Sequence, residues 1–198
     1  MTAPIRCWGS GDPAYEAYHD EEWGRPVTDE RGVFERLCLE GFQSGLSWRT
    51  ILRKRESFRA AFAGFDPDVV ARFGEREVER LVGDPGIVRH RGKIEATVAN
   101  ARATLALRAD TPLSELVWGY RRDGEPPATW VAQTPESVEL SKRLRRAGFR
   151  FVGPTTVYAT MQAIGVVNDH LAECHVREAV ERDRRAVRSN SGRRRSRA

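Results

Sequence analysis

The sequence of 198 residues has no long apolar run. None of its segments approaches the ~20 consecutive apolar residues that a bilayer-spanning helix needs. The first residues, Met-Thr-Ala-Pro-Ile-Arg, contain no apolar core of a signal peptide. We therefore expect no membrane partner and a cytoplasmic location.

Cysteine is scarce, with only Cys7, Cys38 and Cys174 in the chain. An odd number of cysteines in a cytoplasmic protein gives no basis for a disulfide framework. Binding of a metal by thiolates is the better expectation for at least two of them.

Signals for β-strands and internal repeats are also missing. Instead, apolar residues recur at helical spacing, and proline follows an N-capping residue at positions 12–13, 66–67, 111–112 and 134–135. These patterns predict an all-α fold of about seven to nine short helices, with residues 121–130 as a loop.

Positive charge is concentrated at the end of the chain. Residues 182–198 contain eight arginines and one acid, Asp183, whereas the rest of the chain has 25 basic and 27 acidic residues. The net charge of +5 is therefore no argument that the folded body binds nucleic acid. A DNA-binding surface therefore has to be a local patch. Candidate basic residues are Arg89, His90, Arg91 and Lys93. The alternative is that these four residues form an ordinary solvated surface.

Residues 183–198 are rich in arginine and serine and almost free of apolar side chains, which predicts a disordered tail. Such a tail either adds salt-sensitive, nonspecific affinity for DNA or is a passive solvated extension.

Two pairs of potential metal ligands lie near opposite ends of the chain. Cys7 and His19 are near the start, while His170 and Cys174 are spaced by one helical turn near the end. Two thiolates and two imidazoles form a closed tetrahedral set, which suits one structural Zn²⁺ that links the chain ends. The alternative is ordinary thiols and surface histidines. His175 is a rival ligand, whereas Cys38 lies on an apolar stripe and is expected in the core.

Residues 134–166 have the pattern of a helical hairpin. We expect one helix over 134–146, a tight connection over 148–154, and a second helix over 155–164. A glycine in the connection would let a phosphate approach the backbone, and the N–H groups at the start of the second helix would face it. The alternative is an ordinary helical hairpin. The residues expected to contact DNA are Gly153, Thr155, Thr156 and Arg150.

Aromatic side chains are grouped in a way that suits recognition of a flipped, cationic base. Four of them fall within 16 residues of the N-terminal region, and a glutamate, Glu40, precedes a further tryptophan, Trp48. Rings can stack on a base and gain a cation–π attraction, while a carboxylate accepts a hydrogen bond from an exocyclic amine. The alternative is simple core packing. The four N-terminal aromatic residues are Trp8, Tyr15, Tyr18 and Trp23.

Over residues 6–174 the chain resembles the DNA-3-methyladenine glycosylase I family. The resemblance rests on six ordered motifs: AYHDEEWG (17–24), CLEG (38–41), GLSW (45–48), RHRGKI (89–94), GFRFVG (148–153) and VNDH (167–170). It implies a helix–hairpin–helix DNA glycosylase fold, with a single glycosylase domain of two packed helical subdomains over 1–182.

The resemblance also implies roles for individual residues. It implies that Glu40 is catalytic and that one structural zinc is held by Cys7, His19, His170 and Cys174. It implies a base pocket of Trp48 and Tyr18, with Tyr15, Trp8, Trp23 and Phe42 close by. Phe42 is a departure, because a polar residue is expected there.

The implied activity is hydrolysis of the N-glycosidic bond of 3-methyladenine in double-stranded DNA by a monomeric enzyme. No lysine lies between Phe151 and Tyr158 to form a Schiff base, so the enzyme would be monofunctional. Asp169 is near the place where related glycosylases carry an aspartate, although it could equally orient His170. Two other classes are a non-catalytic zinc-stabilised DNA-binding module, which needs no base pocket, and a zinc hydrolase, which needs an open metal position.

Overall fold

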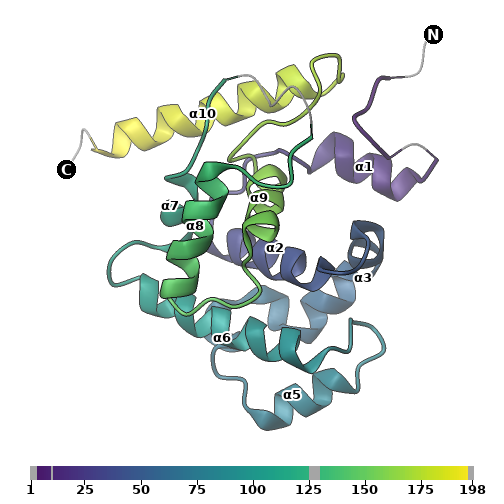
Figure 1. The fold of residues 1–198 in the computed structure, drawn as a ribbon, viewed down its shortest axis with the longest axis vertical. Helices are drawn as coiled ribbons and strands as arrows, with labels where there is room; N and C mark the ends of the chain where they lie inside the picture. The colour runs from purple at the N-terminus through teal and green to yellow at the C-terminus, as the bar shows by residue number, and fades with distance from the viewer. Residues whose placement is uncertain (1–3, 10, 125–129, 196–198) are drawn as a thin grey trace. The chain divides into compact units, whose positions relative to one another are not determined.

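The computed structural model describes residues 4–9, 11–124 and 130–195, and the side chains of these residues up to 187. The described residues form α-helices and one 3₁₀ helix, η1, and contain no strand (Figure 1), which confirms the all-α prediction. None of these helices is both long and apolar enough to cross a membrane. The elements are α1 (Pro13–Glu21), α2 (Glu30–Gln43), α3 (Trp48–Ala61), η1 (Ala63–Phe65), α4 (Pro67–Val70), α5 (Glu75–Val82), α6 (Arg91–Leu107), α7 (Leu113–Trp118), α8 (Pro135–Arg146), α9 (Pro154–Ala163) and α10 (Arg177–Arg195).

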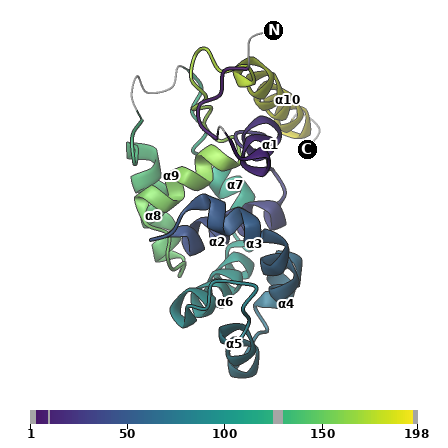
Figure 2. The same ribbon diagram turned by 90° about the vertical axis from the view of Figure 1, so that its right-hand side faces the viewer.

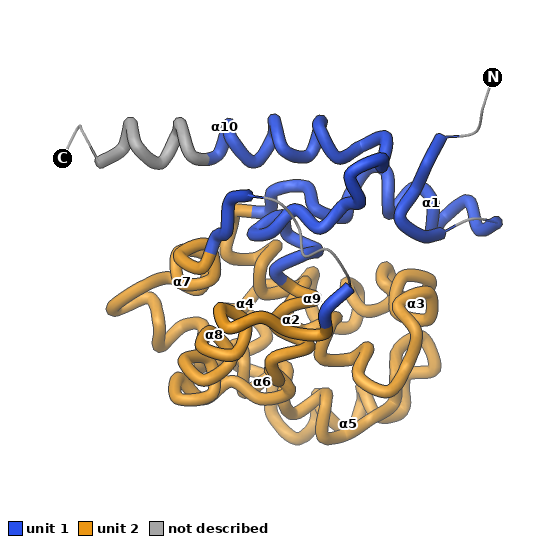
Figure 3. The backbone as a smooth tube through the Cα atoms, turned by 45° about the horizontal axis from the view of Figure 1, so that its top comes forward, with its two compact units in different colours: residues 1–27, 121–131, 161–198 blue, residues 28–120, 132–160 orange. Residues whose placement is uncertain are grey.

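The chain divides into two compact units, each built from separate stretches of sequence (Figure 3). Unit 1 comprises Met1–Val27, Arg121–Val131 and Met161–Ala198, and unit 2 comprises Thr28–Tyr120 and Ala132–Thr160. Neither unit is therefore a continuous segment of the sequence.

Helix starts follow the predicted capping pattern in most cases. Prolines open α1, α4 and α8, and the preceding Asp12, Asp66 and Thr134 each accept a hydrogen bond from a backbone N–H of the first turn. This arrangement satisfies a donor that would otherwise have no partner within the helix. At the fourth predicted start the helix begins one residue later, because Pro112 itself occupies the N-cap and Leu113 is the first helical residue of α7.

The core of unit 2 is organised around α2 and α6. Helix α2 contacts α3, α6 and α7, while α6 also contacts α4 and α5. The predicted apolar stripe of α2, from Val33 to Cys38, is buried. Four buried phenylalanines continue this core as a row of rings, Phe42, Phe58, Phe62 and Phe65. The centroids of neighbouring rings in this row are 4.6–6.4 Å apart. These rings hold Phe42 near the C-terminal end of α2.

Helices α8 and α9 form the predicted hairpin, and they lie side by side in both ribbon views (Figure 1 and Figure 2). Helix α8 ends before Gly148, whose φ of +96° is favourable only for glycine.

Helix α10 continues into the segment predicted to be a disordered tail. Residues 183–195 belong to this helix, while 196–198 lie outside the described residues. The helix is fixed by Val180 and Arg184, both fully buried, and arginine and alanine favour helix. Residues 121–124 and 130 are non-helical, as predicted for the 121–130 loop, and 125–129 lie outside the described residues.

Candidate functional site

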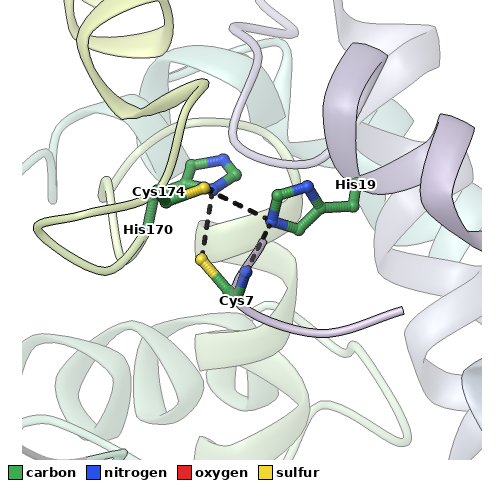
Figure 4. A group of neighbouring side chains, drawn as sticks. All are labelled: Cys7, His19, His170 and Cys174. Atoms are coloured by element: carbon green, nitrogen blue, oxygen red, sulfur yellow. Dashed lines mark hydrogen bonds between the residues drawn. The ribbon is translucent and has the colours of Figure 1, made fainter. Parts of the chain in front are cut away.

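Cys7, His19, His170 and Cys174 come together in unit 1 (Figure 4). One ligand atom from each lies within 4.8 Å of the other three. The sulfur of Cys174 is 3.4 Å from His170 Nδ1 and 3.6 Å from His19 Nε2, and the sulfur of Cys7 is 3.5 Å from His170 Nδ1. The two thiols and two imidazoles therefore converge on one point, so these four residues could hold a metal ion.

The second nitrogen of each histidine is held away from this point. His19 Nδ1 lies 2.8 Å from Asp20 Oδ1, and His170 Nε2 lies 3.1 Å from the Trp23 carbonyl oxygen. Both imidazoles are fully buried, and burial lowers the pKa of His170 to about 4. Each ring therefore presents a defined nitrogen, and the neutral form of His170 that a metal requires is favoured at neutral pH.

The two competing thiol and imidazole candidates lie elsewhere. His175, the rival ligand, points its Nδ1 at the Ile5 carbonyl oxygen at 2.9 Å and its Nε2 at Asp20 at 3.4 Å. Cys38 is 3% exposed in the core of unit 2, as predicted, and burial raises the pKa of its thiol. Among the described residues, the cysteines and histidines that come together are the four named from the sequence, and their binding of a metal stays a prediction.

The four predicted aromatic residues form a cluster beside these histidines. Trp8 is central to it, with ring centroids 4.5 Å from Tyr15, 5.9 Å from Tyr18 and 5.4 Å from Trp23. Trp23 also packs edge-on against His170, with a centroid distance of 4.6 Å. Tyr18 and Trp23 are buried, whereas Trp8 and Tyr15 are partly exposed. The cluster thus packs against His19 and His170 within unit 1, and its more accessible members are Trp8 and Tyr15.

Glu40 lies in unit 2, near the C-terminal end of α2, and is 6% exposed. Burial raises the pKa of its carboxyl to about 8, although the positive charge of Arg36, one turn earlier, acts to lower it. At neutral pH the free protein therefore keeps this carboxyl largely protonated. A buried acid with such a perturbed pKa is typical of a functional group.

Phe42 lies in the core and is 1% exposed. Its ring packs on Phe58 at 4.6 Å and Phe62 at 5.9 Å. Two residues along a helix differ in direction by about 200°, so Phe42 points away from the face that carries Glu40. In this structure Phe42 packs in the core of unit 2, and its contact with the base stays a prediction. Trp48, which opens α3, is 7% exposed.

Lys93 was expected on a basic surface, but it is buried and binds the end of α2. Its ammonium donates hydrogen bonds to the carbonyl oxygens of Phe42, at 2.9 Å, and Ser44, at 2.6 Å. Two neighbouring residues also make contacts within the protein: His90 caps the N-terminus of α6, and Arg91 forms ion pairs with glutamates of α5. Lys93 therefore fixes the connection between the helix of Glu40 and the helix of Trp48.

Asn100 is a positioning residue that the sequence analysis missed. Its side chain donates to the Arg150 carbonyl oxygen at 3.1 Å and accepts from the Arg150 N–H at 2.7 Å, so it holds both sides of one residue in the hairpin turn. Ser141 adds a hydrogen bond of 2.6 Å to the Val152 carbonyl oxygen. The next residue, Phe151, has a φ of +54° that a phenylalanine rarely adopts, and these bonds help to hold it there. A polar residue among the apolar and small residues of α6 was the available signal.

The predicted DNA contacts lie around this turn. Arg150 and Thr155 are exposed, and Gly153 and Thr156 are partly exposed. Pro154 is the first residue of α9, so Thr155 and Thr156 belong to its first turn, where backbone N–H groups have no partner within the helix. The hairpin therefore presents the groups that a phosphate would need.

Comparison with known proteins agrees with these features. Residues 8–178 match the family model described as methyladenine glycosylase. The chain belongs to the methyladenine glycosylase family.

The DNA-3-methyladenine glycosylase 1 of Escherichia coli (strain K12) is 50% identical over 177 residues, which is 85% of this chain and 95% of that protein. The DNA-3-methyladenine glycosylase of Haemophilus influenzae is 42% identical, with 85% and 96% of the two chains covered. A structure of 3-methyladenine DNA glycosylase I from Staphylococcus aureus, solved to study 3-methyladenine recognition, superposes on this chain with a TM-score of 0.80. The two chains are 36% identical, and the match covers 85% of this chain and 94% of that one. The all-helical fold is thus shared with the family.

Proposed function

We propose that this protein is a DNA-3-methyladenine glycosylase, a monofunctional enzyme of DNA repair that hydrolyses the N-glycosidic bond of 3-methyladenine in DNA. Membership of the methyladenine glycosylase family over residues 8–178 supports this activity. The single structural observation that carries it is the buried Glu40, whose pKa is raised to about 8.

Glu40 suits a ligand that brings its own positive charge. Methylation at N3 makes the adenine a cation, and a flipped base enters a site shielded from water. The cation favours the ionised form of Glu40, which then accepts a hydrogen bond from the exocyclic amine. The proton of Glu40 is released to solvent on binding. The free-energy cost of burying the charged Glu40 carboxylate is therefore offset only when the cationic base is bound.

The cationic base needs no acid to leave. Water adds to the sugar carbon as the N-glycosidic bond breaks, and the electron pair of that bond goes to the base. Neutral 3-methyladenine, an abasic sugar and one proton are the products. In this scheme Glu40 orients the base and stabilises the positive charge of the transition state. Trp48 is proposed to stack on the base, and the base contacts of Tyr18, Tyr15, Trp8 and Trp23 stay predictions.

The test is release of 3-methyladenine from methylated DNA by the purified protein and by Glu40→Gln. We expect the unaltered chain to release the base and the variant to do so about 100-fold more slowly, because glutamine cannot carry the compensating charge. Glu56→Gln is the matched control, since its side chain is 79% exposed on α3. Equal rates for Glu40→Gln and Glu56→Gln would refute the role of Glu40. No release by the unaltered chain would refute the function.

We further propose that one structural Zn²⁺ binds Cys7, His19, His170 and Cys174. With Zn–S near 2.3 Å and Zn–N near 2.0 Å, a tetrahedral site places sulfur and nitrogen about 3.5 Å apart. The sulfur–nitrogen separations of 3.4, 3.5 and 3.6 Å fit these edges. Four protein ligands leave no position for water, so the ion would stabilise unit 1 and supply no chemistry to base excision.

We also propose that the hairpin of α8 and α9 is a helix–hairpin–helix element that binds the phosphate backbone of double-stranded DNA. The exposed Arg150 and the first turn of α9 support this role, because such groups bind phosphate without reading sequence. We expect a monomer in solution, which light scattering after size-exclusion chromatography would test.

A further inference from the structure

Phe151, in the turn between α8 and α9, is unfavourable for the fold in two ways. Its φ of +54° lies in the left-handed region, where a bulky side chain costs free energy that a glycine would avoid. Its side chain is also 39% exposed, so a large part of an apolar ring stays in contact with water. For folding alone, a glycine would suit this position better.

The surrounding structure nevertheless holds this turn from two helices. Asn100 of α6 binds both backbone groups of Arg150, the residue before Phe151. Ser141 of α8 binds the carbonyl oxygen of Val152, the residue after it. A strained residue that persists because its surroundings fix it is typical of a functional site.

The turn lies against the helix that carries Glu40. A methyl group built on the buried Gly41, which follows Glu40 in α2, would lie 3.5 Å from both the Cβ and the carbonyl oxygen of Phe151. On another side, the Phe151 ring meets the exposed His90 edge-on, with a centroid distance of 6.1 Å. All of these residues belong to unit 2. A nucleotide in contact with Phe151 would therefore be a close neighbour of the nucleotide whose base reaches Glu40.

The groups around Phe151 in the chain indicate which part of DNA its ring would meet. The exposed Arg150 precedes it, and the first turn of α9 follows it, and both are proposed phosphate contacts. Between two successive phosphates of a strand lies a deoxyribose, whose C–H groups form an apolar surface. Bases in a duplex are stacked on one another, and inserting a ring between them costs free energy. The sugar is therefore the apolar surface that the ring can reach without disturbing the duplex.

We infer that Phe151 contacts a deoxyribose of the strand bound by the hairpin, next to the flipped nucleotide, and so favours DNA over RNA at this position. The inference rests on the proposed function, which makes DNA the ligand of the hairpin. A ribose in the same place would press its 2′-hydroxyl against the ring, where the hydroxyl loses its hydrogen bonds to water. Phe151 is then a residue that determines specificity for the sugar, whereas the phosphate contacts do not distinguish the two sugars.

The first test removes the ring and keeps the turn. Phe151→Gly and Phe151→Asn both tolerate a positive φ. Binding is measured to a DNA duplex with one abasic-site analogue, which fixes the position of the protein on the DNA. We expect about 10-fold weaker binding, as for the loss of about 60 Å² of apolar contact. The slope of log K against log salt should not change, because no charge is removed. Phe151→Tyr, which keeps the ring, is the matched control and should bind like the unaltered chain.

The second test places a single ribonucleotide at each position in turn in the strand that carries the abasic-site analogue. The unaltered chain and Phe151→Tyr should bind about fivefold more weakly when the ribonucleotide occupies one position near the analogue. Phe151→Gly and Phe151→Asn should be insensitive to the ribonucleotide at that position.

Equal affinities of the unaltered chain and the two variants without the ring would overturn the inference. An equal response of all four proteins to the ribonucleotide would do the same. A lower salt slope in Phe151→Gly and Phe151→Asn would also overturn it, because the phosphate contacts would then be lost with the turn. Release of 3-methyladenine by the unaltered chain is measured in parallel. Its absence counts against the proposed function, whereas normal release with equal affinities counts only against the role of Phe151.

Discussion

Glu40 shows how one residue can be unfavourable for the fold and still suit the site. Burial raises its pKa from about 4.5 to about 8, so the folded protein binds a proton that the unfolded chain releases. Between these two values ionisation favours the unfolded chain. The free energy of unfolding therefore falls as pH rises from 4.5 towards 8, and the loss is complete above the folded pKa.

Glu40→Gln should reverse this loss. Glutamine has a similar shape and does not ionise, so we expect little change in the free energy of unfolding at pH 4 and an increase of a few kcal/mol at pH 8. Urea unfolding at both pH values measures the difference. Glu56→Gln, an exposed position, should show no such dependence, and an equal effect of Glu40→Gln at both pH values would contradict the raised pKa.

The proximity of the two cysteines and two histidines and the helix starts could be predicted from the sequence, for different reasons. Zinc selects a narrow set of side chains, so Cys7, His19, His170 and Cys174 are recognisable although up to 167 positions separate them. A capping pair such as Asp12 and its proline acts on its own helix, and no distant residue is required.

Lys93 and Asn100 could not be assigned in this way. Their partners are backbone carbonyl and N–H groups 51 and 50 positions away, and every residue type presents such groups. The direction of the Phe42 side chain could not be assigned from its motif either. Phe42 is two positions from Glu40, but its ring points to the opposite face of α2 and packs on Phe58. A motif thus places residues in a region but does not decide which face each side chain occupies.

At the scale of elements, the α8–α9 hairpin depends on a side chain from α6. The amide of Asn100 binds both backbone groups of Arg150 and so sets the path of the turn that carries the proposed phosphate contacts. Without it, two polar backbone groups in a partly buried turn lose their partners.

We expect Asn100→Leu to lower the free energy of unfolding by about 1–3 kcal/mol and to weaken binding of duplex DNA. The affinity change separates a positioning role from a merely stabilising one. Thr104→Val is the control, because Thr104 is fully buried on the same helix and its hydroxyl donates a hydrogen bond within α6, to the Asn100 carbonyl oxygen at 2.9 Å. Unchanged affinity in Asn100→Leu, or an equal loss in both variants, would argue against a role in positioning the turn.

At the scale of the whole molecule, each unit is assembled from separate stretches of the chain. The proposed zinc joins the first stretch of unit 1, through Cys7 and His19, to its last stretch, through His170 and Cys174. A metal bond that closes so long a loop stabilises the fold mainly by restricting the unfolded chain.

The purified protein should therefore contain about one zinc ion per chain. We expect Cys174→Ser to lose the ion and to lower Tm by about 10 °C, as loss of a structural metal site costs several kcal/mol. Cys38→Ser is the matched control, because this thiol is buried in unit 2, and it should retain zinc. Metal analysis and thermal unfolding measure both effects, and a zinc-free protein of undiminished stability would exclude the proposed site.

The discontinuous units also impose an order on synthesis. A chain emerging from the ribosome has all of unit 2 once residue 160 has left the exit tunnel, whereas unit 1 has to wait for its last stretch. Its first 27 residues, with Cys7 and His19, are made first and can complete their fold only after Cys174 appears. We therefore expect the first stretch of unit 1 to complete its fold after unit 2, contrary to the usual progression from the N-terminus. Helix α10, which Arg184 anchors, belongs to this late stretch.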